Sequence, residues 1–430
     1  YIEGQVCPLR HAIYICSKSG QRPYRPAVTR HSTYKALWQK YWPEFLSNYA
    51  NTHEVRFGKI DEWKLTEAKK LLTCGKFGRG FQWHECESCK VVLAVPFSCK
   101  SRLCLSCYRK RLFGWSIQLS KVLNPALLHF HVVFTMPGRL SDLLFARRVN
   151  PRFLNLLAAR VYAKRQRLTA AVDEAFRPGI LSTVHLAGNS LNFNPHVHAI
   201  ATRDLVNPKT GEMREVNFMP YQTIRYDWQR AVCRYLRRRR LISKDEYDFF
   251  LRQYPKGFHV YFQRIAGETS DVIFKTAQYI AFGLFHNSQI ENVDHERKTL
   301  IFRFKSHVDP QSREKTFSSL TMPIDEFFAR MLFFLPDRHE KSIRYYGIYV
   351  RPAKRAAVEQ AAQMSLWAEG IKCSFDTPNP TACPLCEKNM RTYTIFARDA
   401  LRFEKRLRTQ YFLADGYFFL KSTRAPPARS

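Results

Sequence analysis

The sequence predicts a chain that mixes α-helices with β-strands and is long enough for two or three domains. Its 430 residues are 45% hydrophobic, which is sufficient for large buried cores. Short apolar runs that end at proline or glycine, such as 129–135, are typical of strands. Longer segments repeat large side chains at helical spacing, as Trp38, Tyr41 and Trp42 do.

The same two patterns place the elements in order along the chain. The cysteine-rich stretch 74–110 lacks helical spacing, and residues 188–190 form a turn between two strands. Helices are expected over 38–49, 109–123, 151–176, 221–241, 271–284 and 323–334. Strands are expected over 129–135, 180–186, 196–202, 258–265, 299–304 and 315–320. Beyond about residue 350 the chain is expected to be helical and basic.

The charge balance restricts the class of partner. Lys and Arg number 69 against 36 Asp and Glu, which gives a formal net charge of +33. So large an excess of positive charge indicates a polyanionic partner, most plausibly nucleic acid. No apolar run approaches the roughly 18–20 residues that a membrane span requires, so no membrane partner is expected.

Cysteine pairs predict structural zinc in a reducing, cytoplasmic compartment. Cys86-x-x-Cys89 and Cys104-x-x-Cys107 together suit one tetrahedral site of four thiolates. A second zinc ion is an open alternative whose candidate ligands are Cys74, His84 and Cys99, without an evident fourth. Cys383-Pro-Leu-Cys386, with Cys373 upstream, is a third pair that would need partners from a distant part of the chain.

Histidines suggest a second kind of metal site. His196 and His198 lie two residues apart in a predicted strand, so both side chains point to one face. His185 lies in the preceding strand and can join them if the two strands pair, with Asn194 and Gln278 as rival ligands. Three imidazoles leave coordination positions open, as metal catalysis requires. They favour Mn²⁺ or Zn²⁺, and substrate phosphate oxygens would allow Mg²⁺.

Taken in order, these blocks resemble HUH nucleases, named for His–hydrophobic–His, and more narrowly the rolling-circle insertion-sequence transposases of the IS91/ISCR type. The resemblance covers about residues 60–355. Its blocks are the cysteine module 74–107, the strand 131–137, Thr183–Gly188, Asn194–His198, Tyr279, Leu320–Phe327, and Leu335-Pro336 with Ile343–Gly347. The chain departs from the family at Gln82 and Leu103, where relatives often carry histidine. Gly283 stands where many relatives have a second tyrosine, as in a single-tyrosine variant.

The resemblance implies an α+β fold: an HUH domain whose central antiparallel sheet carries the His196 strand at its middle, with flanking helices. It also implies metal-dependent transesterification on single-stranded DNA, including hairpin or element-end DNA. His185, His196 and His198 would hold catalytic Mg²⁺ or Mn²⁺, and Tyr279 would form a 5′-phosphotyrosine link. Structural Zn²⁺ would sit in the cysteine module. The protein is expected to be bacterial, cytoplasmic and nucleoid-associated, with a homodimer as one open arrangement for the second strand transfer.

The expected domains are an N-terminal basic region (1–60), a zinc-binding, DNA-binding module (61–123), a catalytic domain (124–322) and a C-terminal helical basic region (323–430). Two other functions stay open: a replication initiator or relaxase with the same chemistry, and a non-catalytic zinc-dependent DNA-binding regulator. The basic side chains expected to contact DNA are Lys100, Arg102, Arg109, Lys110, Arg237, Arg238, Arg239 and Arg240.

Overall fold

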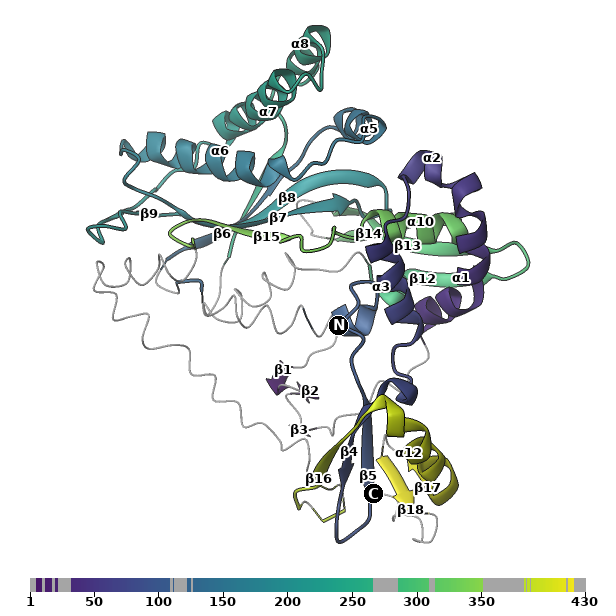
Figure 1. The fold of residues 1–430 in the computed structure, drawn as a ribbon. Coiled ribbons are helices and arrows are strands. Elements are labelled where there is room, and N and C mark those ends of the chain that lie inside the picture. Colours follow the sequence, from purple (N-terminus) through teal and green to yellow (C-terminus); the bar gives the residue numbers. More distant parts are fainter. Residues whose placement is uncertain are drawn as a thin grey trace.

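A computed structural model gives the fold (Figure 1). It describes residues 32–108, 122–124, 127–265, 285–308, 314–350 and 388–414, with shorter stretches at 5–9, 12–17, 20–21, 111, 383, 385–386 and 417–420. The architecture is mixed α and β, as the sequence predicts. Within these residues no helix combines the length and the apolar character that crossing a bilayer requires.

A five-stranded antiparallel sheet lies at the centre of the catalytic region. Its strand order is β11-β6-β8-β7-β15, so β8 is the middle strand. The predicted position of the strand that carries His196 and His198 is therefore confirmed. The strands are β6 (His129–Phe134), β7 (Gly179–Ala187), β8 (Phe193–Thr202), β11 (Val260–Arg264) and β15 (Ile343–Gly347).

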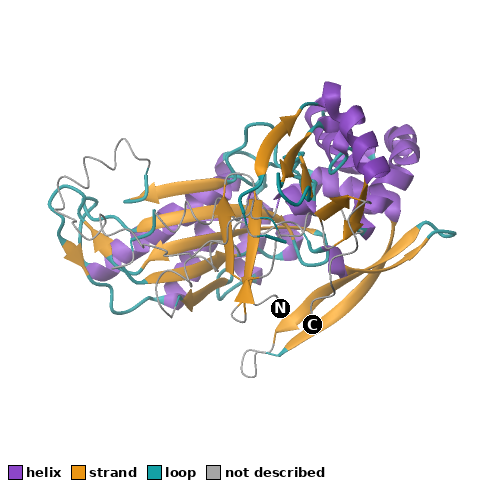
Figure 2. Ribbon diagram, turned by 90° about the horizontal axis from the view of Figure 1, so that it is seen from below, coloured by secondary structure: helices purple, strands orange, loops and turns teal. Residues whose placement is uncertain are grey.

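Helices cover one face of this sheet. Figure 2, seen from below, shows its strands in front of helices, and Figure 1 labels these helices above the sheet. They are α5 (Gly138–Ala146), α6 (Phe153–Ala170), α7 (Tyr221–Arg238) and α8 (Lys244–Gln253). Val197 and Ala199 of β8 are buried in the core under these helices. Because side chains alternate along a strand, His196 and His198 lie on the opposite face.

A second core joins parts of the chain that are far apart in sequence. Trp38 stacks on Phe328 with ring centroids 4.3 Å apart. The predicted boundaries at residues 60 and 322 both run through this core, so the segments beside them do not pack as separate units. Its elements are α1 (Thr33–Thr52), α2 (Glu54–Phe57), α3 (Glu62–Leu72), β12 (Ile290–Asp294), β13 (Thr299–Val308), β14 (Lys315–Pro323) and α10 (Ile324–Phe333).

The C-terminal region corrects one prediction. A helical, basic end beyond about residue 350 was expected, but the described residues 388–414 and 417–420 contain three strands beside one helix. Their Tyr, Phe and Thr side chains favour strands, and the hairpin of β4 and β5 offers edges with which to pair. The sheet order is β16-β4-β5-β18-β17 (Figure 1, bottom). Its elements are β4 (Phe81–Glu85), β5 (Val92–Pro96), β16 (Arg391–Ile395), α12 (Ala397–Gln410), β17 (Tyr411–Ala414) and β18 (Tyr417–Leu420).

Most other predicted elements are confirmed: four helices correspond to α1, α6, α7 and α10, and all six strands to β6, β7, β8, β11, β13 and β14. The predicted helix 271–284 lies outside the described residues, as does 109–123 except for positions 111, 122 and 123. The remaining elements are short: β1 (Gln5–Leu9), β2 (Ala12–Ser17), β3 (Gly20–Gln21), η2 (Phe77–Arg79), β9 (Leu205–Val206), β10 (Met213–Arg214) and η3 (Asn287–Gln289).

Gly347, at the end of β15, provides a test of the edge of the central sheet. Its φ of +63° is in the left-handed region, and a Cβ there would lie 1.7 Å from the Pro178 carbonyl oxygen. We expect Gly347→Ala to lower the free energy of unfolding by roughly 3 kcal/mol. The matched control is Gly138→Ala at the start of α5, where a Cβ meets nothing within 4 Å.

The control should stay within about 1 kcal/mol of wild type. Urea unfolding followed by circular dichroism measures both variants. Equal stability of the two would show that β15 can move away from Pro178 without loss.

Candidate metal centres

Three histidines converge on the face of the central sheet opposite the helices. His185 of β7 pairs directly with His196 of β8, and His198 follows two residues later. The ring centroids of His185 and His198 are 4.4 Å apart, and those of His196 and His198 are 4.8 Å apart. One nitrogen from each ring lies within 4.8 Å of the others. The structure thus brings together the three side chains that the sequence singles out.

Burial keeps two of these imidazoles, those of His196 and His198, in the neutral form. Desolvation lowers the pKa of His198 well below its ordinary value, and the nearby His185, His196 and His131 lower it further. Desolvation also lowers the pKa of His196. A neutral imidazole has a free lone pair, which is the form that binds a metal ion. These two side chains can therefore bind a metal near neutral pH without first releasing protons.

Hydrogen bonds fix which ring nitrogens face the centre. His196 Nδ1 lies 2.7 Å from the main-chain oxygen of Asn194. A carbonyl can only accept, so Nδ1 donates and Nε2 is left as the ligand atom. Asn194, a rival ligand by sequence, orients His196 in this way. The other rival, Gln278, lies outside the described residues, as does Tyr279.

His131 is a residue whose role the sequence did not reveal. It lies on β6 with its Nε2 2.9 Å from His198 Nδ1, and the two rings stack at 10°. This contact directs Nε2 of His198 toward the other two histidines. Burial lowers the pKa of His131 to about 4. Its position follows from the pairing of β6 with β8, which puts His131 on the same face of the sheet as His196 and His198.

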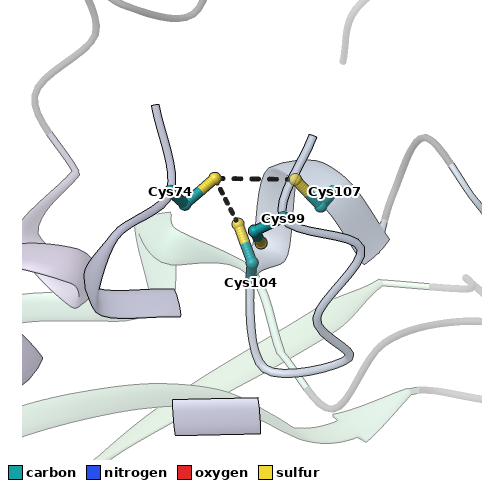
Figure 3. Close-up of side chains that lie close together, drawn as sticks. All are labelled: Cys74, Cys99, Cys104 and Cys107. Carbon is teal, nitrogen blue, oxygen red and sulfur yellow. Dashed lines mark hydrogen bonds between the residues drawn. The ribbon is translucent and has the colours of Figure 1, made fainter. Parts of the chain in front are cut away.

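A first cluster of four cysteines lies between α3 and the segment that follows β5 (Figure 3). Cys74 Sγ is 3.6 Å from both Cys104 Sγ and Cys107 Sγ. Zinc bound tetrahedrally with Zn–S bonds of about 2.3 Å requires sulfurs about 3.8 Å apart, so the cluster fits zinc. Cys99 completes the set. A hydrogen bond from Cys104 is the largest of the effects that lower the pKa of Cys74 to about 7.

A second cluster brings together cysteines that lie about 300 positions apart in the sequence. Cys86 and Cys89 lie in the turn between β4 and β5, and Cys383 and Cys386 precede β16. Cys86 Sγ and Cys386 Sγ are 3.6 Å apart.

The predicted grouping of the cysteines is therefore wrong. Cys86 and Cys89 do not share a site with Cys104 and Cys107, since strand β5 carries the chain roughly 17 Å from the hairpin turn back to its base. The proposed second set of Cys74, His84 and Cys99 is also corrected. His84 lies on β4, and its Nδ1 contacts Thr392 Oγ1 of β16 at 2.8 Å, whereas Cys74 and Cys99 complete the first cluster.

Comparison with known proteins bears on both kinds of site. Residues 37–136, which include the first cysteine cluster, match the family model Zn_Tnp_IS91, "Transposase zinc-binding domain". Residues 179–356, which include the three histidines, match Y2_Tnp, "Putative transposase". The chain is 23% identical over 374 residues to the transposase for insertion sequence element IS801 of Pseudomonas savastanoi pv. phaseolicola, covering 80% of this chain and 87% of that protein. The chain belongs to the IS91 family of transposases.

No solved structure gives a significant match to this IS91-family transposase. Its family membership implies DNA binding and a DNA-cleaving, strand-transferring activity. The cysteine clusters and the histidine cluster suit two different kinds of metal ion. Buried thiolates suit structural zinc, and neutral imidazoles with open coordination positions suit a reactive divalent cation.

The basic residues expected to contact DNA fall in different environments of the transposase. Lys100 is exposed, but Arg102 is half-buried and its guanidinium donates to the Glu340 carbonyl oxygen at 3.3 Å. The run Arg237–Arg240 is exposed at the end of α7, on the helical side of the sheet and away from the histidines. Arg109 and Lys110 lie outside the described residues.

Proposed function

We propose that this transposase cuts and rejoins single-stranded DNA by transesterification at the histidine cluster. The observation that carries the proposal is the convergence of His185, His196 and His198 on β7 and β8, two neighbouring inner strands of the sheet. Their Nε2 or Nδ1 atoms would hold Mg²⁺ or Mn²⁺, which when bound polarises a phosphate oxygen. The sheet fixes the three rings, so little reorganisation is needed when the ion and substrate bind.

Tyr279 is the proposed nucleophile, on the strength of the family resemblance. Its phenolic oxygen attacks phosphorus, a new P–O bond forms, and the bond to the 3′ oxygen breaks. The phenolic proton leaves to solvent and the released 3′ oxygen takes up a proton. The 5′-phosphotyrosine link retains the phosphodiester energy, so rejoining requires no nucleotide cofactor. With one tyrosine, the second transfer would use a second protomer, Tyr279 again, or a free 3′-OH.

The experiment is adduct formation with a labelled single-stranded oligonucleotide from the element's end, in Mn²⁺ or Mg²⁺. Wild type should give a protein–DNA adduct that survives denaturation, and Tyr279→Phe should abolish it. The matched control is Tyr345→Phe. Tyr345 of β15 pairs with Leu181 of β7, and both side chains pack on the face of the sheet that carries the histidines. Its neighbour Tyr346 pairs with Ile180 and packs on the helical side.

The outcomes separate the alternatives. An adduct that persists in Tyr279→Phe but disappears in Tyr345→Phe would transfer the role of nucleophile to Tyr345. Tight binding of a verified end sequence without any adduct would favour the non-catalytic regulator. The replication-initiator alternative has less support, since both family models that match describe transposases.

His131 provides a test of metal positioning. We expect His131→Ala to weaken Mn²⁺ binding about 10- to 100-fold, because the partner of a metal-bound imidazole holds its orientation and tautomer. His131→Gln should recover most of the affinity, since its amide can reach His198 Nδ1. Isothermal titration with Mn²⁺ measures both. Equal affinities for wild type and His131→Ala would contradict a positioning role.

A further inference from the structure

We infer that Cys86, Cys89, Cys383 and Cys386 bind a second structural zinc ion, and that this ion fastens the C-terminal sheet segment to the β4–β5 hairpin. The four sulfurs lie within 4.8 Å of one another. The family zinc-binding match ends at residue 136, so it contains only half of this site. The inference does not depend on the proposed chemistry of the histidine cluster.

The two halves of the site are built alike. Each is a Cys-x-x-Cys turn closed by a main-chain hydrogen bond from the first cysteine to the residue five positions later. Cys86 N donates to Val91 O at 2.9 Å, and Cys383 N donates to Lys388 O at 2.8 Å. Cys89 N also lies 3.4 Å from Cys86 Sγ. Turns of this kind present two thiolates in one direction, and two of them facing each other form a closed tetrahedral zinc site.

The sulfur distances favour a metal over a disulfide. Cys86 Sγ and Cys386 Sγ are 3.6 Å apart, far beyond the S–S bond length of about 2.05 Å and near the spacing of about 3.8 Å around zinc. All four cysteines are free thiols. Four unbonded thiols crowded together in a small core have no other evident role.

The attachment of β16 also calls for such an ion. Of its five residues only Ile395 is buried, and the side chains of 391–394 are exposed. The core at the cysteine end is small: its fully buried members are Cys86, Val91, Leu93, Cys383 and Met390. So little apolar surface gives a short edge strand weak attachment, and small modules commonly depend on a metal for stability.

The ion would thus complete a module that is built from two distant segments of the chain, the hairpin 81–96 and the C-terminal elements β16 and α12. The hairpin 81–96 pairs with β16, and α12 packs beneath the strands through Ala400 and Leu407. Helix α12 exposes several basic side chains: Arg398, Arg402, Lys405, Arg406 and Arg408. Fastening β16 therefore also fixes the position of a positively charged helix.

The test is zinc content of the purified full-length chain by mass spectrometry. Wild type should hold one zinc ion more per chain than the double variant Cys383→Ser/Cys386→Ser, whether or not the histidine cluster also takes up zinc. The matched control is Cys233→Ala, which replaces a buried free cysteine on α7 that belongs to neither cluster, and it should hold as much zinc as wild type. An equal zinc content of wild type and the double variant would overturn the inference.

Hydrogen exchange gives a second readout, which separates the release of β16 from the β4–β5 hairpin from general unfolding. In the double variant, amides of β16 should exchange at least about tenfold faster, whereas those of β8 should be unchanged. If the variant is insoluble, cobalt substitution of wild type decides instead. Two equivalents should be bound with the visible absorption of tetrahedral thiolate sites, and saturation at one equivalent would refute the second site.

Discussion

His198→Ala should reduce DNA cleavage on the order of 10³-fold or more, equivalent to a barrier about 4 kcal/mol higher. His198 is the most buried of the three histidines and contacts both His185 and His131. Its loss leaves two imidazoles, too few to hold the ion in a fixed position. The measurement is the rate of oligonucleotide cleavage at saturating Mn²⁺, with Mn²⁺ affinity measured in parallel.

The matched control is His259→Ala, an exposed histidine just before β11. It should cleave DNA at nearly the wild-type rate. Circular dichroism should show that both variants keep the native fold, so that a lost activity reflects the site. Cleavage by folded His198→Ala within about tenfold of wild type would refute the histidine cluster as the catalytic centre.

Cys104→Ser is expected to remove the zinc ion of the first cluster and to unfold the surrounding core. Cys99 and Cys104 are buried in the same core as Trp38 and Phe328. Structural zinc contributes about 10–16 kcal/mol to the folding of zinc-finger peptides, comparable to the whole stability of a typical domain. We therefore expect a much lower unfolding temperature, or no cooperative transition, for the body built from α1–α3 and β12–β14.

Zinc analysis and thermal unfolding measure this effect, and Cys233→Ala again serves as the control. That variant removes a buried thiol without touching a cluster, so it should keep its zinc and lose little stability. A Cys104→Ser protein that lacks one zinc ion but unfolds at the wild-type temperature would show that the core is stable without the metal.

Much of the candidate catalytic site could be predicted because it depends on local geometry. The period-two alternation of a strand puts His196 and His198 on one face whatever the rest of the chain does. Consecutive strands joined by a short turn usually pair, which correctly brings His185 opposite His196. The position of Tyr279 relative to this site stays a prediction.

The partners of the cysteines could not be predicted in the same way. Spacing identifies Cys86-x-x-Cys89 and Cys104-x-x-Cys107 as ligand pairs, but it does not say which pairs meet. The hairpin of β4 and β5 separates these two, and β16 brings Cys383 and Cys386 to the first pair from about 300 residues away in sequence. His131 was missed for a similar reason, since its role appears only when β6 pairs with β8.

The sequence by itself therefore determined the types of element, the face on which His196 and His198 lie, the metal-binding character of the cysteine pairs and the basic character of the protein. These properties follow from side-chain periodicity and composition, which act over a few residues. Only the tertiary structure decided which cysteines lie together, that His131 contacts His198, and that residues 33–72 and 290–335 form one core. Such contacts depend on strand pairing between distant segments, and local sequence leaves that pairing open.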